Sequence, residues 1–294
     1  MNARDDARYR LGNGNWAGLA QSGLSLADLL EAAEEWAAPL AGVERPWLCW
    51  NVDDAWCVVQ QRLVRDAGWT PLVGFDPRVG PPPLVDGAVC IDFNRRLGLP
   101  TMWLHFPLEF AFVFCDRLAF WHADCLLRRG KMATLAAMFE SLRDGEMAAV
   151  LPSEGWRARL RPKQRRYWEV VGCTTRGASR SQFDNGCGWW MNFAMHPSNS
   201  AAERARRAAY YWDCGTGIRF WHRQQAGTVH LIPEPDIAEG HFSGVYRADY
   251  RRASPKDHHR NLSQELALNF NLADACRQLN LQQFLDPLPG QPAT

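Results

Sequence analysis

Two segments of the chain place a carboxylate or an imidazole beside an apolar run, which is a pattern typical of a metal site. His122 and Asp124 follow the apolar run 118–121, and His241 follows Gly240 much later in the chain. Carboxylate oxygens and imidazole nitrogens bind divalent ions, and such an ion neutralises a diphosphate. Asp124 and the two histidines are therefore candidate ligands of a divalent ion. An ordinary surface aspartate with half-buried histidines would produce the same sequence pattern.

A glycine-rich segment, 183–193, is a second candidate surface. Gly186 and Gly188 permit backbone conformations that are closed to other residues, so the chain can approach a ligand closely there. Asn185 and Asn192 flank an apolar core that is typical of a strand. We expect Asn185, Gly186 and Gly188 to contact a substrate, although a buried strand entered through a glycine turn has the same pattern.

These segments, in this order, resemble motifs of GT-A glycosyltransferases, and among them the glycogenin and lipopolysaccharide galactosyltransferase family. The segment 118–127 resembles the family's strand, Asp-x-Asp, helix unit, with His122 in place of the first aspartate. The segment 185–192 is similar to the strand that lines the sugar-donor site, with Cys187 in place of a glycine. The segment 239–247 resembles the His-Phe-x-Gly-x-x-Lys-Pro-Trp signature.

The resemblance implies the transfer of a sugar from a nucleotide-sugar donor to a saccharide or other hydroxyl acceptor. In the family the signature histidine completes the metal site and the lysine touches the diphosphate, and these positions correspond to His241 and Arg247. The resemblance therefore implies a divalent metal, Mn²⁺ or Mg²⁺, held by Asp124 and His241, with His122 as a third ligand or a ribose contact. Arginine is always charged and grips phosphate with two donors, so Arg247 keeps the electrostatic role. The motifs identify no nucleophile or base. The nearest polar candidates are Gln182 and Asp184, and Asp53 either meets the nucleotide or lies in an acidic turn facing solvent.

The elements that must position these residues alternate between strand-like and helical patterns. Apolar runs predict strands, and apolar residues at spacings of three and four predict helices. The expected strands are 46–51, 70–75, 85–93, 118–121 and 147–151, and the expected helices are 25–36, 54–66 and 132–142. Such alternation favours an α/β fold with a mostly parallel sheet flanked by helices. The resemblance implies that this fold is GT-A-like.

The expected organisation is a single GT-A-like domain between two disordered ends. Its nucleotide-binding half precedes an acceptor and metal-completing half. The boundaries are 1–20 for a flexible N-terminal lead, 21–285 for the domain (46–150 and 151–260 for its halves, 261–285 for C-terminal helices) and 286–294 for a disordered tail.

Composition argues against several other classes of protein. The 33 Lys and Arg nearly balance the 32 Asp and Glu, so a globally basic nucleic-acid binder is not indicated. No apolar run approaches the ~20 residues needed to span a bilayer, and the first residues lack the apolar stretch of a secretory signal. We therefore expect a cytoplasmic protein.

Two alternatives to an active enzyme remain open. The first is a glycosyltransferase-like binding protein that has lost catalysis, suggested by His122 at the first aspartate position. The second is a nucleic-acid-binding protein that uses the basic stretch 157–180, with Tyr167 and Trp168 as a stacking surface.

Overall fold

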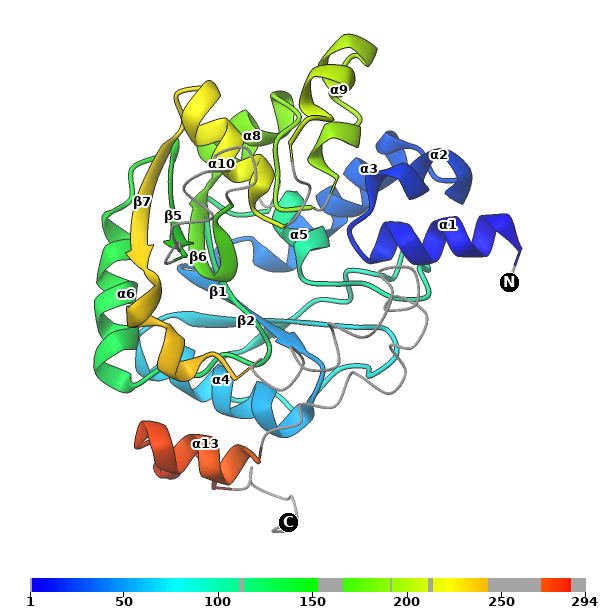
Figure 1. The fold of residues 1–294 in the computed structure, drawn as a ribbon. Coiled ribbons are helices and arrows are strands. Elements are labelled where there is room, and N and C mark those ends of the chain that lie inside the picture. Colours follow the sequence, from blue (N-terminus) through cyan, green and yellow to red (C-terminus); the bar gives the residue numbers. More distant parts are fainter. Residues whose placement is uncertain are drawn as a thin grey trace.

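The computed structural model describes residues 2–110, 114–152, 166–190, 192–210, 214–242 and 271–286. Its strands are β1 (Pro46–Asn51), β2 (Thr70–Phe75), β3 (Val89–Cys90), β4 (Arg117–Trp121), β5 (Glu146–Leu151), β6 (Trp168–Thr175) and β7 (Thr228–Pro233). They form one sheet of order β3-β2-β1-β4-β6-β5-β7 (Figure 1). Only β6 runs antiparallel to its neighbours. The prediction of a mostly parallel α/β sheet is therefore confirmed.

Burial on both faces explains why the central strands are continuous apolar runs. Every residue of β1 is buried, and alternate side chains enter two separate cores. Leu48 and Trp50 pack on one face, whereas Trp47 and Cys49 pack on the other. The sheet is thus the middle of three layers, and polar side chains reach solvent at the ends of its strands.

Helices cover both faces of the sheet (Figure 1). One face carries α4 (Asp54–Asp66), α6 (Arg129–Ser141) and α13 (Leu272–Leu279). The other carries α1 (Ala3–Gly12), α3 (Leu26–Ala37), α5 (His105–Glu109), α8 (Arg176–Asp184) and α10 (Thr216–Gln224). The short helices α2 (Leu19–Ser22) and α9 (Ala201–Arg207) complete the α-helices of the described residues.

The sequence predicts several of these elements closely. The helix α4 has the expected bounds, and α3 begins after the expected cap, where the side chains of Ser25 and Asp28 form a capping box. The predicted strand 85–93 is reduced to Val89–Cys90, because only two of its residues pair with β2. Within 261–285 the structure describes α13, and 262–270 lies outside the described residues, as does the tail from 287.

The prediction of a flexible lead over 1–20 is wrong for the residues that the structure describes. Residues 3–12 form α1, whose Ala7 and Leu11 are fully buried on one face. Trp16 is buried as well, and its ring stacks on Trp190 with centroids 4.3 Å apart. Polar residues dominate the segment on average, so its apolar anchors become apparent only where a distant partner covers them.

No described helix is both long and apolar enough to cross a membrane.

A carboxyl group, Glu109, lies fully inside the core on the α5 side of the sheet. Its Oε2 accepts a hydrogen bond of 2.9 Å from the backbone N–H of Trp189, and its Oε1 lies 3.6 Å from Nε2 of His196. Burial raises the pKa of Glu109 to about 8, against the lowering effect of the N–H groups that face it. The folded protein therefore holds a proton there that the unfolded chain releases at lower pH.

This buried acid predicts a measurable pH dependence of stability. Because the pKa of Glu109 is 4.5 when unperturbed and about 8 when folded, its contribution to the free energy of unfolding falls as pH rises between these values. The slope reaches at most ~1.4 kcal/mol per pH unit. Burial also lowers the pKa of His122 to about 4 and that of His196 to about 3, and these shifts make stability rise with pH up to about 6.5. The contribution of Glu109 is therefore read as a difference: in urea unfolding at pH 5, 6.5 and 8, the free energy of unfolding of the parent protein relative to Glu109→Gln should fall as pH rises. Glu34→Gln, at an exposed position, serves as the control and should follow the parent protein.

Candidate metal centre

The residues after β4 lie where the chain connections of the sheet diverge. From β1 the chain proceeds outward to β2 and β3, whereas β4 pairs with the other edge of β1. Ligands of open α/β sheets bind outside the carboxyl ends of the strands at such a switch point. His122 directly follows the last residue of β4, so the fold places it at this position.

Backbone and side-chain hydrogen bonds fix the turn from His122 to Cys125. The N–H of His122 donates to the carbonyl of Val170, and that of Cys125 donates to the carbonyl of His122. From α4, the buried Gln60 donates through Nε2 to the carbonyls of His122 and Cys125, at 2.7 and 2.8 Å. The turn that carries Asp124 is therefore held from both β6 and α4.

A short antiparallel contact brings His241 to this turn. The N–H of Leu126 donates to the carbonyl of Gly240, and the N–H of Phe242 donates to the carbonyl of Asp124. A Cβ at position 240 would lie 1.8 Å from the carbonyl oxygen of Leu126, so only glycine permits this approach. The Gly-His-Phe pattern thus has a structural cause as well as a chemical one.

The structure brings His122, Asp124 and His241 together. Oδ1 of Asp124 lies 3.6 Å from Nε2 of His241 and 3.8 Å from Nδ1 of His122. One ligand atom from each residue lies within 4.8 Å of the others, and all three residues are half-buried. The set offers two imidazole nitrogens and one carboxylate, with access from solvent.

Two further residues, which the sequence did not single out, extend this group. Oε1 of Glu169 on β6 lies 3.6 Å from Nε2 of His122 and 3.6 Å from Nε2 of His105 on α5. His122 therefore faces Asp124 with one ring nitrogen and Glu169 with the other. Glu169 is the one acid in the basic stretch 157–180, a contrast that could have indicated it. His105 lies in an apolar segment and leaves no comparable signal.

Burial and neighbouring charges set the protonation of the centre. Burial lowers the pKa of His122 to about 4, although the carboxylates of Glu169 and Asp124 act in the opposite direction. Burial also acts to raise the pKa of Glu169, but the imidazoles of His105 and His122 together with Arg166 outweigh it and hold that pKa far below its usual range. At neutral pH the centre thus presents a neutral His122 and an ionised Glu169, the forms that bind cations.

The structure gives Asp53 a role in folding. Its carboxylate accepts hydrogen bonds from the backbone N–H groups of Ala55 and Trp56 and so caps α4. It belongs to neither of the two groups of potential metal ligands found among the described residues.

The two residues predicted to be catalytic lie on α8, which follows the opposite end of β6 from Glu169. Gln182 is buried, with its Nε2 3.0 Å from the sulfur of Met147 at the start of β5. Asp184 is exposed and pairs with Arg180 one turn earlier. Because β5 runs parallel to β4, the start of β5 lies at the opposite end of the strands from His122. The structure therefore separates both residues, which were predicted to be catalytic, from the candidate centre.

Within the glycine-rich segment, residues 185–190 form a loop after α8, and no strand forms in the described residues of 183–193. Gly186 has φ of +61°, and a Cβ there would lie 2.3 Å from Oδ1 of Asn199. A Cβ on Gly188 would lie 1.6 Å from Oε1 of Glu109. These glycines make room for side chains of the protein itself, which explains the pattern without a ligand.

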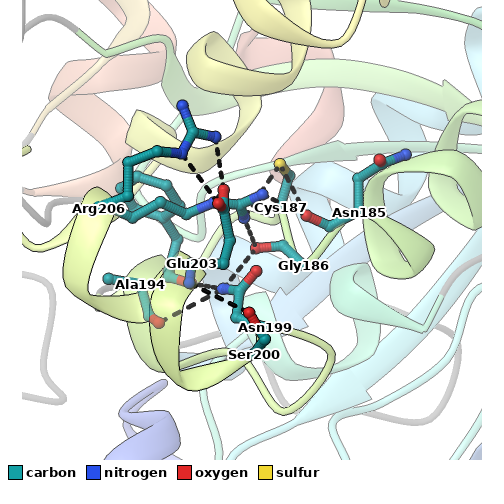
Figure 2. A network of polar contacts seen from close by, with 10 residues as sticks. Asn185, Gly186, Cys187, Ala194, Asn199, Ser200, Glu203 and Arg206 are labelled. Carbon is teal, nitrogen blue, oxygen red and sulfur yellow. Dashed lines mark hydrogen bonds and ion pairs between the residues drawn. The ribbon is translucent and has the colours of Figure 1, made fainter.

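A buried arginine holds the same loop in place. Arg207, which is 3% exposed, donates to the carbonyls of Asn185 and Gly186 at 2.8 and 2.7 Å and pairs with Glu203. Figure 2 shows Glu203 between Arg206 and this loop. The predicted substrate contacts of Asn185, Gly186 and Gly188 are thus replaced by internal contacts.

Other predicted positions are only partly described. Arg247 lies outside the described residues, as does 157–165 of the basic stretch. Tyr167 is described and is 2% exposed, so its ring is not available as a stacking surface for a nucleic-acid base.

Comparisons of the chain with protein-family models, with curated proteins and with solved structures give no match.

The hydrogen bonds of Gln60 predict that α4 preorganises the centre. Gln60→Leu removes both donors to the turn and should lower the affinity for Mn²⁺ or Zn²⁺ by about 10- to 100-fold, as loss of an outer-shell partner does. The adjacent Gln61, equally buried, bonds instead to Pro83 and Val85. Gln61→Leu is the matched control and should reduce stability by a similar ~1–3 kcal/mol without changing metal affinity. Metal affinity would be measured by calorimetric titration. Equal metal affinities in the two variants would contradict the role of Gln60 in orienting the ligands of the centre.

The Arg207 network predicts that the glycine-rich loop is a structural element. Arg207→Met should lower the free energy of unfolding by about 2–4 kcal/mol, because it leaves buried carbonyls without a donor. Arg206 shares Glu203 but is 53% exposed, and Arg206→Met should cost no more than about 1 kcal/mol. Urea unfolding of both variants tests this. An Arg207→Met protein of unchanged stability that fails to bind nucleotide would restore the ligand role of the loop.

Proposed function

We propose that the protein is a glycosyltransferase of GT-A type that transfers a sugar from a nucleotide-sugar donor to a hydroxyl acceptor, assisted by a divalent ion at His122, Asp124 and His241. The observation that carries the proposal is the convergence of Asp124 and His241 at the switch point of the sheet. The resemblance assigns these two positions to one metal site from the sequence alone. Asp124 and His241 lie far apart in the sequence, so their proximity in the structure supports the proposal independently of the motifs.

The order of elements around Asp124 also supports the proposal. The chain passes from β4 through His122 and Asp124 to α6 and then to β5, which is the strand, acidic motif, helix, strand unit that the resemblance implies. His122 stands at the position of the first aspartate of that motif, and its Nδ1 faces Asp124. An imidazole can therefore take over the ligand role of the missing carboxylate.

The three side chains fit a transition metal in both spacing and chemistry. A tetrahedral ion with bonds of about 2.1 Å holds its ligand atoms about 3.4 Å apart. The observed separations of 3.6 and 3.8 Å are close to that value and exceed the length of a hydrogen bond. Two imidazoles with one carboxylate suit Mn²⁺ or Zn²⁺ better than Mg²⁺, which prefers oxygen ligands.

Each residue of the centre has a definable task in such a transfer. Asp124 supplies negative charge, and the rings of His122 and His241 supply nitrogen ligands that leave further positions open to substrate oxygens. Gln60 and the contact at Gly240 fix the orientation of these ligands. When bound, the ion would offset the negative charge that develops on a departing diphosphate.

The proposal predicts that metal and nucleotide stabilise the protein together. A nucleoside diphosphate should raise the melting temperature only when Mn²⁺ is present, by several degrees at about 100 times the dissociation constant. The double variant Asp124→Ala/His241→Ala should lose this effect. The matched control is Glu146→Gln/His230→Gln, which alters a carboxylate and imidazole pair elsewhere on the sheet, 3.0 Å apart, and should retain it.

A panel of uridine, guanosine, adenosine and cytidine diphosphates would be compared by thermal denaturation, and the sugar donors that bind would then be tested for turnover by NMR. Stabilisation that is independent of metal, or that persists in the double variant, would contradict the proposed site. A metal-dependent shift without turnover of any donor would favour the degenerate binding protein.

A further inference from the structure

A second group of potential ligands shares His122 with the proposed catalytic site. It consists of His105, His122 and Glu169, each of which offers one ligand atom within 4.8 Å of the others. The side chains of His105 and Glu169 are only 4% and 11% exposed. Three elements, namely α5, the end of β4 and the start of β6, thus direct polar atoms to one buried point.

Hydrogen bonding does not account for this group. Nε2 of His105 and Nε2 of His122 each lie 3.6 Å from Oε1 of Glu169, which is beyond hydrogen-bond length. Both nitrogens and Oε2 of Glu169 are buried without a hydrogen-bond partner among the described residues. Unpartnered buried polar atoms carry a cost of about 1–3 kcal/mol each, so three at one point call for an occupant that satisfies them.

A divalent transition metal is an occupant of the right size and chemistry. The two separations of 3.6 Å approach the ~3.4 Å edge of a tetrahedral site with bonds of about 2.1 Å. Two histidines and a glutamate form a ligand set that zinc enzymes use. Glu169 offsets half of the charge of the ion in a place where an unpaired cation would be strongly disfavoured.

We infer that His105, His122 and Glu169 form a second transition-metal site, and that His122 bridges it to the first as an imidazolate. Nδ1 of His122 faces Asp124 and Nε2 faces Glu169, so each ring nitrogen points to a different ion. Binding of the second ion displaces the remaining N–H proton of the ring, which leaves to solvent. Two ions carry four positive charges against three from imidazolate, Asp124 and Glu169, which leaves one positive charge to attract an anionic substrate.

The bridge rests on the metal site of the proposed function, whereas the second site itself does not depend on glycosyl transfer. The full-length protein, freed of metal with a chelator, would be titrated with Zn²⁺ by calorimetry and with Co²⁺ by visible absorption. We expect two equivalents in the parent protein and one in Glu169→Gln, His105→Gln and His241→Gln. His230→Gln, an exposed histidine paired with Glu146, should retain two.

The outcomes separate the two sites. One equivalent in the parent protein that survives both Glu169→Gln and His105→Gln would overturn the second site and leave the first intact. One equivalent that is lost in those variants but kept in His241→Gln would support the second site and contradict the metal site of the proposed function. Circular dichroism of each variant, and the agreement of Glu169→Gln with His105→Gln on separate elements, exclude loss of folding as the cause.

Discussion

The candidate centre depends on a short backbone contact between residues 124–126 and 240–242. Two hydrogen bonds, from Leu126 to Gly240 and from Phe242 to Asp124, join a turn after β4 to a segment after β7. Because β4 and β7 are separated in the sheet by β6 and β5, no strand pairing would bring these segments together. The contact in turn requires glycine at position 240, since any side chain there would meet the carbonyl of Leu126. A backbone constraint thus determines where an imidazole and a carboxylate meet.

The buried acids of the protein show how structural and chemical roles differ. Glu109 receives a backbone N–H from Trp189, and burial raises its pKa to about 8, so it is held as a neutral acid within the core. Glu169 faces two imidazoles and has a pKa far below its usual range, so it remains charged. A buried charge persists only where cations or strong donors compensate it. This difference separates an acid that lies within the packed core from one that faces the candidate centre.

The glycine-rich loop shows how a pattern typical of ligand contact arises from packing alone. Gly186 and Gly188 are required because Asn199 and Glu109 occupy the space of their missing side chains. Arg207 then satisfies the carbonyls of the loop from within. A glycine indicates that another group lies close to the backbone, but it does not show whether that group is a ligand or another part of the protein.

The sequence by itself determined the regular elements that nucleate locally. Strands β1 and β2 and helices α3 and α4 follow from apolar runs, helical periodicity and caps, which are all interactions within about a dozen residues. It also singled out Asp124, which lies after an apolar run, and His241, because both match motifs of one family.

Only the tertiary structure decided that His105 and Glu169 join His122, that Gln182 and Asp184 lie at the opposite edge, and that the first residues pack as helices. These facts depend on contacts between residues far apart in the chain, and such contacts leave no periodic signal at either partner. The physical reason is that the sequence specifies the type of each side chain, whereas the order of the strands in the sheet decides whether that side chain is buried and which residues it contacts.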